Sequence, residues 1–245
     1  MSSVAYAELH AHSAYSFLDG ASLPEELVER SVELGLSALA LTDHNGFPGI
    51  IQLSEAARDV GLPVVVGTEL AVGTAEPRVG SPDPAGDHVV ILARSPRGYT
   101  ALSRAVGGAQ LASGKKGEAH YTLPELAGCA QDWMVLTGCR KGSVRRALES
   151  EPVWAEDAAG RALTELQDLF GRDNVAVELT ATGEPLDAER NDVLVRVARR
   201  AGAPAIVTGN VHYARPQDRK IADILAATRA AVSYTHLTLP TICSV

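Results

Sequence analysis

The sequence is poor in cysteine, and it lacks long hydrophobic runs. Only three cysteines occur in 245 residues, Cys129, Cys139 and Cys243. An odd and sparse set of cysteines argues against a disulfide framework and is typical of the reducing cytoplasm. No apolar stretch reaches the roughly 20 residues that cross a bilayer, and residues 1–8 lack the basic and apolar regions of a signal peptide. We therefore expect a soluble cytoplasmic protein without a membrane partner.

The chain also lacks an excess of positive charge, which excludes one broad class of function. It has 22 basic and 30 acidic residues and a formal net charge of -8. Such a chain is not a general binder of phosphate backbones, so any contact with nucleic acid must be local. Bound divalent cations would offset part of the negative charge. Hydrophobic residues make up 46% of the chain, which is enough to form the core of one sizeable domain.

Short apolar runs alternate along the sequence with longer helical patterns. The runs predict strands at 5–10, 38–42, 63–70, 88–93, 133–137, 175–179 and 204–208. Helices are predicted at 24–34, 49–60, 98–111, 144–149, 155–170, 187–201 and 217–231. This alternation is typical of parallel strands with helices outside, and seven strands favour a closed or nearly closed barrel. A doubly wound α/β sheet stays open, although its glycine-rich loop after the first strand is missing.

Local signals mark helix ends and loops. Ser22, followed by Pro24 and Glu25, predicts the start of the first helix. Gly35 and Gly61 predict the ends of the first two helices. The glycine-rich segments 73–86 and 107–117 predict an inserted loop and a second, mobile loop.

Residues 232–245 differ in composition from the rest of the chain. The last predicted helix is rich in alanine and arginine and stops without a cap signal, and Tyr, Thr and Leu then dominate. This segment resembles peptides produced by translation through sequencing-adaptor sequence at the end of a truncated gene. We interpret 1–231 as the domain and 232–245 as foreign, with a natural β-prone terminus as the alternative. His236 and Cys243 accordingly receive no function.

Polar side chains follow most of the predicted strands at the points where the strands end. His10 and His12 are two residues apart, so they can point to the same face at the end of the first strand. Asp19 follows in the same loop, and later strand ends carry Asp43, His44, Glu69, Cys139, Asn210 and His212. The carboxyl ends of barrel strands share one mouth, where the active sites of such barrels lie. Histidine, carboxylate and cysteine ligands suit zinc, manganese or iron.

Single positions in this pattern leave alternatives open. Asp19 before Gly20 can be turn chemistry, and Cys139 can be a small buried hydrophobe. Asp43 can orient a ligand histidine instead of acting directly. Glu69 is more specific, because a glutamate within an apolar run is costly to bury unless it is paired or metal-bound.

His88 is the weakest candidate on local grounds. It precedes the fourth apolar run, and strand-end geometry does not predict a ligand there. Taken alone, it is better interpreted as a surface histidine. Arg140 and Lys141 follow the fifth strand and could steer a phosphate towards the mouth, whereas we expect Arg145 and Arg146 to lie on a solvated helix face.

The ordered set of these motifs resembles the polymerase and histidinol phosphatase (PHP) family. Residues 9–21, which read Leu-His-Ala-His-Ser-Ala-Tyr-Ser-Phe-Leu-Asp-Gly-Ala, are similar to its first motif as found at the start of bacterial C-family DNA polymerases. Segment 88–94 is similar to a strand of the family and raises the weight of His88. Segments 136–142 and 210–213 look most like the error-prone branch of these polymerases.

The resemblance implies a distorted seven-stranded β/α (TIM-like) barrel with up to three divalent metals, zinc, manganese or iron. By position, the implied ligands are His10, His12, Asp19, His44, Glu69, His88, Cys139, Asn210 and His212. Asn210 stands where the family usually has aspartate. An amide supplies no negative charge, so we expect weaker occupancy of at least one metal site and slow or absent hydrolysis.

The resemblance also implies an activity and partners. The expected reaction is phosphoester hydrolysis of the 3′–5′ exonuclease type, with Asp19, Asp43 and Arg140 as candidate catalytic residues. DNA and the rest of a polymerase chain that acts in replication and damage-tolerant repair are the expected partners; possible partners in a mutagenesis complex stay unspecified. A polymerase active site is absent from these residues, so this fragment alone should not synthesise DNA. A free-standing phosphatase for a small ester and a catalytically silent structural domain stay open.

Overall fold

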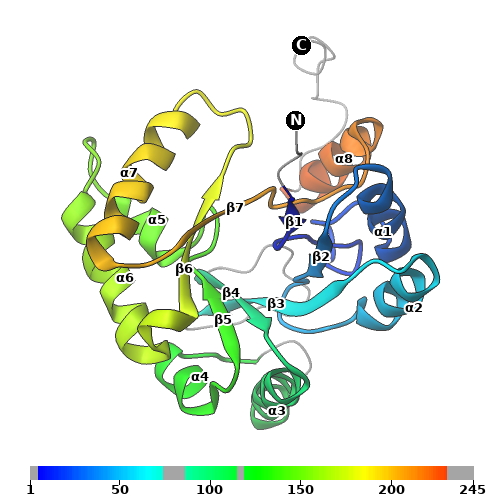
Figure 1. Cartoon of the computed structure of the whole chain (residues 1–245), viewed down its shortest axis with the longest axis horizontal. Coiled ribbons are helices and arrows are strands. Elements are labelled where there is room, and N and C mark those ends of the chain that lie inside the picture. The colour runs from blue at the N-terminus through cyan, green and yellow to red at the C-terminus, as the bar shows by residue number, and fades with distance from the viewer. Residues whose placement is uncertain (1–4, 74–85, 115–118, 231–245) are drawn as a thin grey trace.

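Seven strands lie in sequence order around one sheet in the computed structural model, which describes residues 5–73, 86–114 and 119–230. The strands are β1 (Ala7–Glu8), β2 (Ala38–Leu41), β3 (Val64–Val72), β4 (Asp87–Ala93), β5 (Trp133–Leu136), β6 (Val175–Thr180) and β7 (Ala205–Thr208). Figure 1 shows the sheet curling round a central axis with helices on its outside. Residues 232–245 and most of the predicted 73–86 loop lie outside the described residues.

Backbone contacts just beyond β1 and β7 close the barrel. Ala11 and Val211 form a parallel bridge. The His12 N–H donates to the Val211 carbonyl at 2.8 Å, and the Val211 N–H donates to the His10 carbonyl at 2.9 Å. This closure confirms the predicted barrel over the doubly wound sheet, and it brings the segment of His10 and His12 beside the segment of His212.

β4 runs antiparallel to both of its neighbours, whereas the other strand pairs are parallel. The expectation of parallel strands throughout was therefore wrong at this strand. A parallel partner needs a long crossover, usually through a helix, and segment 73–86 is rich in Pro and Gly and has no helical pattern. Because β4 is reversed, its amino end lies at the mouth where the carboxyl ends of β3 and β5 lie. His88 pairs with Ala71 near that end.

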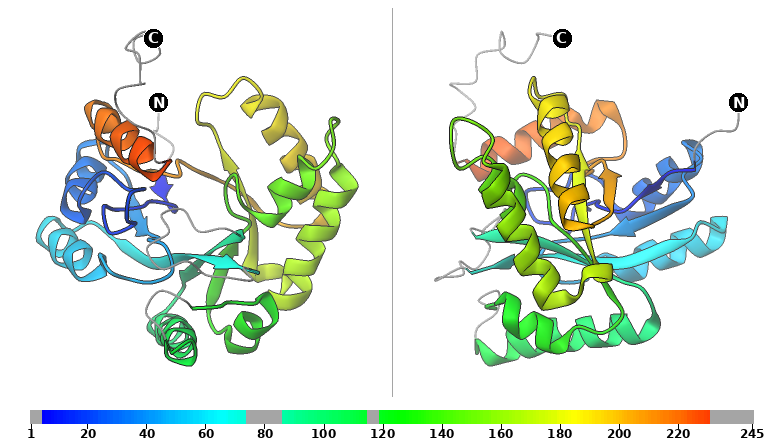
Figure 2. Two further views of the ribbon diagram at one scale, coloured as in Figure 1. Left: turned by 180° about the vertical axis from the view of Figure 1, so that it is seen from behind. Right: turned by 60° about the vertical axis from the view of Figure 1, so that its left-hand side comes forward.

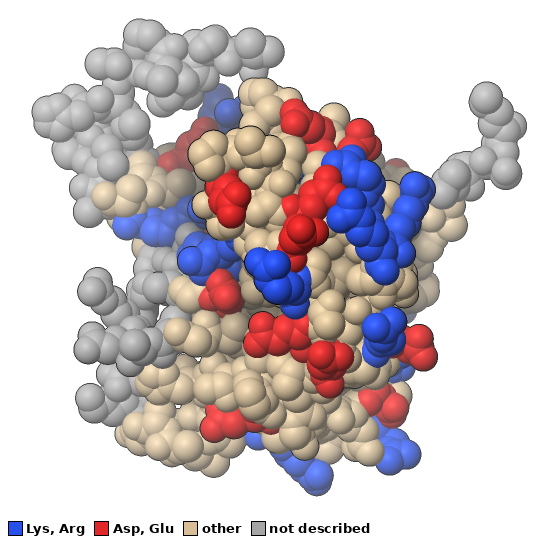
Figure 3. Space-filling view, turned by 90° about the vertical axis from the view of Figure 1, so that its left-hand side faces the viewer, with Lys and Arg blue, Asp and Glu red and all other residues tan. Residues whose placement is uncertain are grey.

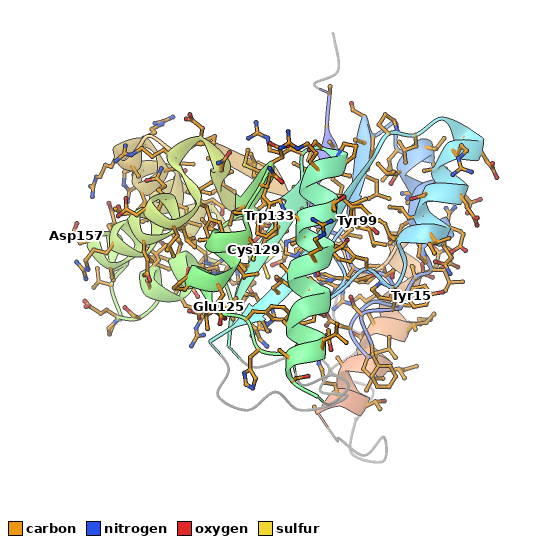
Figure 4. All side chains as sticks on the ribbon, turned by 90° about the horizontal axis from the view of Figure 1, so that it is seen from below. Tyr15, Tyr99, Glu125, Cys129, Trp133 and Asp157 are labelled. Carbon is orange, nitrogen blue, oxygen red and sulfur yellow. The ribbon has the colours of Figure 1, made fainter. Side chains whose placement is uncertain are left out.

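Helices surround the barrel (Figures 1 and 2). They are α1 (Pro24–Glu33), α2 (Ile50–Val60), α3 (Pro96–Ala112), α4 (Leu123–Cys129), α5 (Ser143–Leu148), α6 (Glu156–Phe170), α7 (Asp187–Ala201) and α8 (Arg219–Arg229). The loop prediction at 107–117 was wrong for its first half, because α3 continues through Gly107 and Gly108. Sequence analysis missed the short helix α4, which ends at the exposed Cys129 (Figure 4).

The start of α1 differs from the prediction in its capping residue. Leu23 occupies the N-cap position, and the Ser22 hydroxyl instead accepts a hydrogen bond from the Ala214 N–H at 2.9 Å. Ser22 therefore ties the loop after β1 to the segment after β7. Gly35 and Gly61 follow the first two helices with φ of 68° and 72°, the left-handed conformation that favours glycine.

Strand alternation divides the buried side chains into an outer and an inner layer. Outward residues pack under the helices; Ile91 and Trp133 do so in β4 and β5, and the Trp133 Nε1–H donates to the Gly98 carbonyl of α3 at 2.9 Å (Figure 4). The inner residues form a smaller apolar cluster of Ala40, Val90, Leu92, Leu136 and Ala176. His88, two residues before Val90 in β4, and Glu178, two residues after Ala176 in β6, share that inward face. The interior of the barrel is thus apolar in its deeper part, and its side chains are ionisable at the mouth.

On the outer face over α5, α6 and α7, acidic and basic side chains are interspersed (Figure 3). Arg196 and Arg200 of α7 pair with Glu156 of α6 at 2.6 and 3.0 Å. Charges of both signs therefore alternate on this face. Among the described residues, no helix is both long enough and apolar enough to cross a membrane.

Candidate metal centre

The predicted ligands gather at the carboxyl mouth of the barrel. A cavity of about 300 Å³ opens there, and all nine predicted ligands except His10 line it. Arg140 and Lys141, which sequence analysis had associated with phosphate steering, line it as well. His10 lies deeper and is fully buried. Segments far apart in the chain therefore contribute to one site, as the strand-end pattern predicted.

Glu69 of β3 stands at the centre of the cluster, with 2% of its surface exposed. Its Oε2 lies 3.1 Å from His44 Nδ1, 3.2 Å from His88 Nδ1 and 3.4 Å from His12 Nε2. Its Oε1 lies 3.6 Å from His10 Nε2. Burial opposes ionisation of Glu69, but hydrogen bonds from His44 and His88 outweigh it and hold its pKa well below the usual range.

Hydrogen bonds to the outer ring nitrogens orient His10 and His12. His10 Nδ1 lies 2.7 Å from Glu178 Oε1, and His12 Nδ1 lies 3.2 Å from the Ser16 hydroxyl. That hydroxyl donates to Asp43 at 2.7 Å, so it accepts the proton of His12 Nδ1. Both Nε2 atoms then present lone pairs, and they lie only 3.1 Å apart. Two lone pairs at this distance require a proton or a cation between them.

The ionisation of the two histidines fits this geometry. Burial lowers the pKa of His10, but the Glu178 carboxylate outweighs it and raises that pKa to about 9. Burial and the neighbouring His44 hold the pKa of His12 well below its usual value. Without metal, one proton on His10 therefore bridges to His12. A bound cation would replace that proton.

Asp19 forms the outer part of the site. Its Oδ2 lies 3.0 Å from His44 Nε2 and 3.2 Å from His212 Nδ1, and its Oδ1 accepts a hydrogen bond from Arg229 of α8. Burial raises the pKa of Asp19, but the hydrogen bonds from His212 and His44 outweigh it and hold the pKa far below the usual range. Asp19 is thus an anion within reach of two imidazoles.

The donor set fits divalent cations. Three groups have ligand atoms within 4.8 Å of one another: His10, His12 and Glu69; His44, Glu69 and His88; and His12, Asp19 and His212. Glu69 Oε1 and Asn210 Oδ1 are buried and have no hydrogen-bond partner. Buried polar atoms are normally satisfied, so these atoms are available as metal ligands.

Cys139 lines the cavity but belongs to none of the three groups. Cys139 lies between Thr137 and Gly142, where the chain turns tightly. A Cβ at Gly142 would stand only 2.0 Å from the Thr137 carbonyl oxygen. Burial, with the charges of Glu69 and Glu178, raises the pKa of its thiol. A thiolate ligand would need a nearby cation, and the predicted ligand role of Cys139 stays a prediction.

Asp43 lies behind the cavity rather than in its lining. Its carboxylate accepts hydrogen bonds from the Ser13 N–H and hydroxyl, both at 2.8 Å, and from the Ser16 hydroxyl. This placement favours the alternative in which Asp43 orients a ligand histidine, here through Ser16 on His12. It gives no support to a direct catalytic role.

The two arginines of α5 differ from each other. Arg145 was expected on a solvated face, but it is buried, and its guanidinium lies 3.1 Å from Glu149 and 3.3 Å from Glu184. That expectation was therefore wrong: the carboxylates that surround Arg145 make its burial tolerable. Arg146 is exposed and pairs with Asp87.

Sequence analysis missed two residues of the site. Glu178 carried a usable signal, because it is a charged residue within the apolar run of β6, the same argument that singled out Glu69. Arg229 carried none, because an arginine near the end of an exposed helix is ordinary. The structure shows the first beneath His10 and the second above Asp19.

Two solved structures share the fold. One is from Bifidobacterium adolescentis and is assigned as a metal-dependent phosphoesterase; it is 17% identical, has a TM-score of 0.53, and aligns over 87% of this chain and 90% of its own. The other is an amidohydrolase from Chromobacterium violaceum, 17% identical with a TM-score of 0.56, aligned over 87% and 89% of the two chains. At this identity the likeness concerns the fold alone.

Closer relatives are error-prone DNA polymerases. Those of Mycolicibacterium paratuberculosis and Mycobacterium tuberculosis are 49% and 50% identical over 95% and 94% of this chain. The one of Nocardia farcinica is 45% identical over 96%. This chain spans about a fifth of the length of these relatives, 21% to 24%. The PHP domain family matches residues 8–182, well over half of the sequence. The chain therefore belongs to the PHP domain family.

Proposed function

We propose that the chain is the metal-binding PHP domain of an error-prone DNA polymerase, and that its site hydrolyses phosphodiester bonds at a DNA 3′ end. The polymerase relatives, of which this chain spans about a fifth, support the first part. The proposal includes a cytoplasmic role in replication and damage-tolerant repair synthesis, with DNA and the rest of the polymerase chain as partners.

The observation that carries the proposal is the sharing of ligands. Glu69 belongs to two of the three ligand groups, and His12 also belongs to two. Cations held by these groups would be close neighbours. Divalent metals clustered in this way supply a hydroxide near neutral pH and neutralise charge on phosphate oxygens.

The chain's own residues would hold and orient this centre. Glu178 fixes the ring of His10, and Ser16 fixes that of His12. Arg140 and Lys141 line the same cavity and add positive charge that attracts a phosphate. A cavity of about 300 Å³ is at the small end of ligand pockets, which suits the end of a strand better than the middle of a duplex.

Asn210 favours a second candidate, a domain that binds metal but hydrolyses slowly or not at all. The buried Oδ1 of Asn210 has no hydrogen-bond partner, so it can offer an oxygen to a cation. An amide brings no negative charge, which leaves Asp19 and Glu69 as the carboxylates of the ligand groups. Weaker metal binding and slower hydrolysis would follow.

Elemental analysis of the purified 245-residue chain tests the metal centre. We expect bound zinc, manganese or iron in the wild type and a loss of metal when His10 and His12 are both replaced by alanine. His120 lies outside the centre, so a His120→Ala variant should keep the metal of the wild type. A wild type that takes up none of the three metals would overturn the proposal.

Hydrolysis separates the candidate functions. With added manganese or zinc, release of nucleotides from single-stranded DNA supports the exonuclease, and release of phosphate from a small ester alone supports a free-standing phosphatase. Metal binding without either activity supports the silent domain. In that case Asn210→Asp should restore activity; an inactive Asn210→Asp protein would show that Asn210 is not the cause.

A further inference from the structure

α8 is weakly anchored, yet it contributes to the metal centre. Each of the other described α-helices buries at least one residue, whereas α8 buries none, and its Ile221 and Ile224 are exposed. Figure 1 shows α8 on the same side of the barrel as β1 and α1. Ala222, Ala226 and Arg229 of this helix line the cavity.

Arg229 makes a specific contact there. Its Nη1 donates to Asp19 Oδ1, and the two side chains are 28% and 11% exposed. The other oxygen of Asp19 faces His44 and His212. The two oxygens of the carboxylate therefore have different partners: Oδ1 is bound by Arg229 of α8, and Oδ2 faces the ligand histidines.

The hydrogen bond from Arg229 to Asp19 becomes more important when metal binds. His44 Nε2 and His212 Nδ1 lie 3.0 and 3.2 Å from Asp19 Oδ2, so both rings can donate to that oxygen when no metal is bound. His212 shares a ligand group with Asp19 and His12. Its ligating nitrogen must be deprotonated to bind a metal, so a metal-bound His212 Nδ1 ceases to donate to Asp19. Arg229 has no lone pair for a metal, and its hydrogen bond to Oδ1 persists.

We propose that Arg229 is a positioning residue that holds Asp19 as a one-oxygen metal ligand and thereby couples the docking of α8 to metal binding. This inference rests on the proposed metal-dependent function. Residues that hydrogen-bond to metal ligands commonly contribute 10–100-fold to affinity. The guanidinium also repels a cation, but water in the open cavity screens that repulsion. Displacement of the Asp19 oxygen is not screened in this way, because that oxygen would contact the metal directly.

Metal titration and hydrogen exchange test the proposal in the 245-residue chain. We expect Arg229→Ala to weaken zinc or manganese binding by about 10–100-fold. Arg229→Lys keeps the charge but not the planar donor geometry, so its metal affinity should lie between those of Arg229→Ala and the wild type. Arg219→Ala is the matched control, because Arg219 is on the same helix but does not line the cavity, and its Nε lies 3.9 Å from Asp223 Oδ2.

Hydrogen exchange of the α8 amides measures the coupling directly. Without metal, α8 should exchange faster in Arg229→Ala than in the wild type and Arg219→Ala. Added metal should protect α8 in the wild type and much less in Arg229→Ala. The proposal is overturned if Arg229→Ala binds metal as tightly as the wild type or more tightly, or if its α8 exchange is unchanged. If the wild type binds no metal, the metal-dependent function fails, and the exchange of metal-free α8 decides whether Arg229 holds Asp19.

Discussion

Replacement of Glu178 by glutamine probes how strongly the barrel wall controls the metal centre. Glu178 Oε1 lies 2.7 Å from His10 Nδ1, and both side chains are fully buried. Thr208 donates to the same oxygen. Glutamine keeps the shape and can still accept the His10 proton through its carbonyl oxygen, but it removes the negative charge. The ring orientation is preserved while the basicity of His10 Nε2 falls.

The size of the effect follows from this geometry. Loss of a charged partner of a ligand histidine costs about 10–100-fold in metal affinity, or about 1.4–2.8 kcal/mol. The new amide nitrogen would occupy the position of Oε2, which has no hydrogen-bond partner. A buried donor without an acceptor adds about 1–3 kcal/mol of destabilisation. Glu178→Gln should therefore both bind metal more weakly and unfold more easily.

Competition with a chromogenic chelator measures affinity, and urea unfolding of the metal-free protein measures stability. Glu165→Gln is the control, because this glutamate is exposed on α6 and should change neither quantity. An affinity of folded Glu178→Gln within twofold of the wild type would refute the reasoning. It would mean that the charge of Glu178 does not act on a metal through His10.

Three further changes test other parts of the structure. A chelator should lower the melting temperature of the metal-loaded wild type, because metal present at about 100 times its Kd contributes about 2.7 kcal/mol per site; an unchanged melting curve would contradict this. Gly142→Ala places a Cβ 2.0 Å from the Thr137 carbonyl oxygen and should lower the free energy of unfolding in urea by about 1–3 kcal/mol. Gly160→Ala is the control, because there is open space around Gly160, and it should not destabilise the protein. Asp43→Asn gives the Ser16 hydroxyl a weaker acceptor, so metal affinity should fall although Asp43 is not among the residues that line the metal cavity; equal affinity would count against its positioning role.

The sequence was sufficient for the barrel because alternation is a repeated signal. Seven apolar runs separated by helical patterns predicted the number of strands and most of the helices. The reversal of β4 could not be predicted in the same way, since strand direction depends on the connection that precedes the strand. Segment 73–86 indicated a loop and no helix, which was the available hint that a parallel crossover is missing there.

The site was predictable where a ligand ends a parallel strand, as at His10, His12 and His212. It was not predictable from geometry at His88, because the rule for strand ends assumes parallel strands; only the family resemblance identified it. Contacts that depend on packing were also invisible. The link from Asp43 through Ser16 to His12 joins residues 27 and 4 positions apart, and nothing in their spacing indicates a hydrogen-bonded chain.

The barrel mouth differs from an ordinary polar core in the number of carboxylates that it buries. Glu8, Glu69 and Glu178 are all buried around His10. Burial raises the pKa of Glu8 in spite of hydrogen bonds from the backbone of His10 and the hydroxyl of Tyr6. Hydrogen bonds offset part of the cost of burying these carboxylates, and cations would offset more of it. Neighbouring carboxylates, acting against burial, raise the pKa of His10 to about 9 and that of His44 to about 10. Protons on these two rings compensate for part of this charge, and divalent cations would compensate for more. Metal bound at this ionisable layer would therefore add to the stability of the fold.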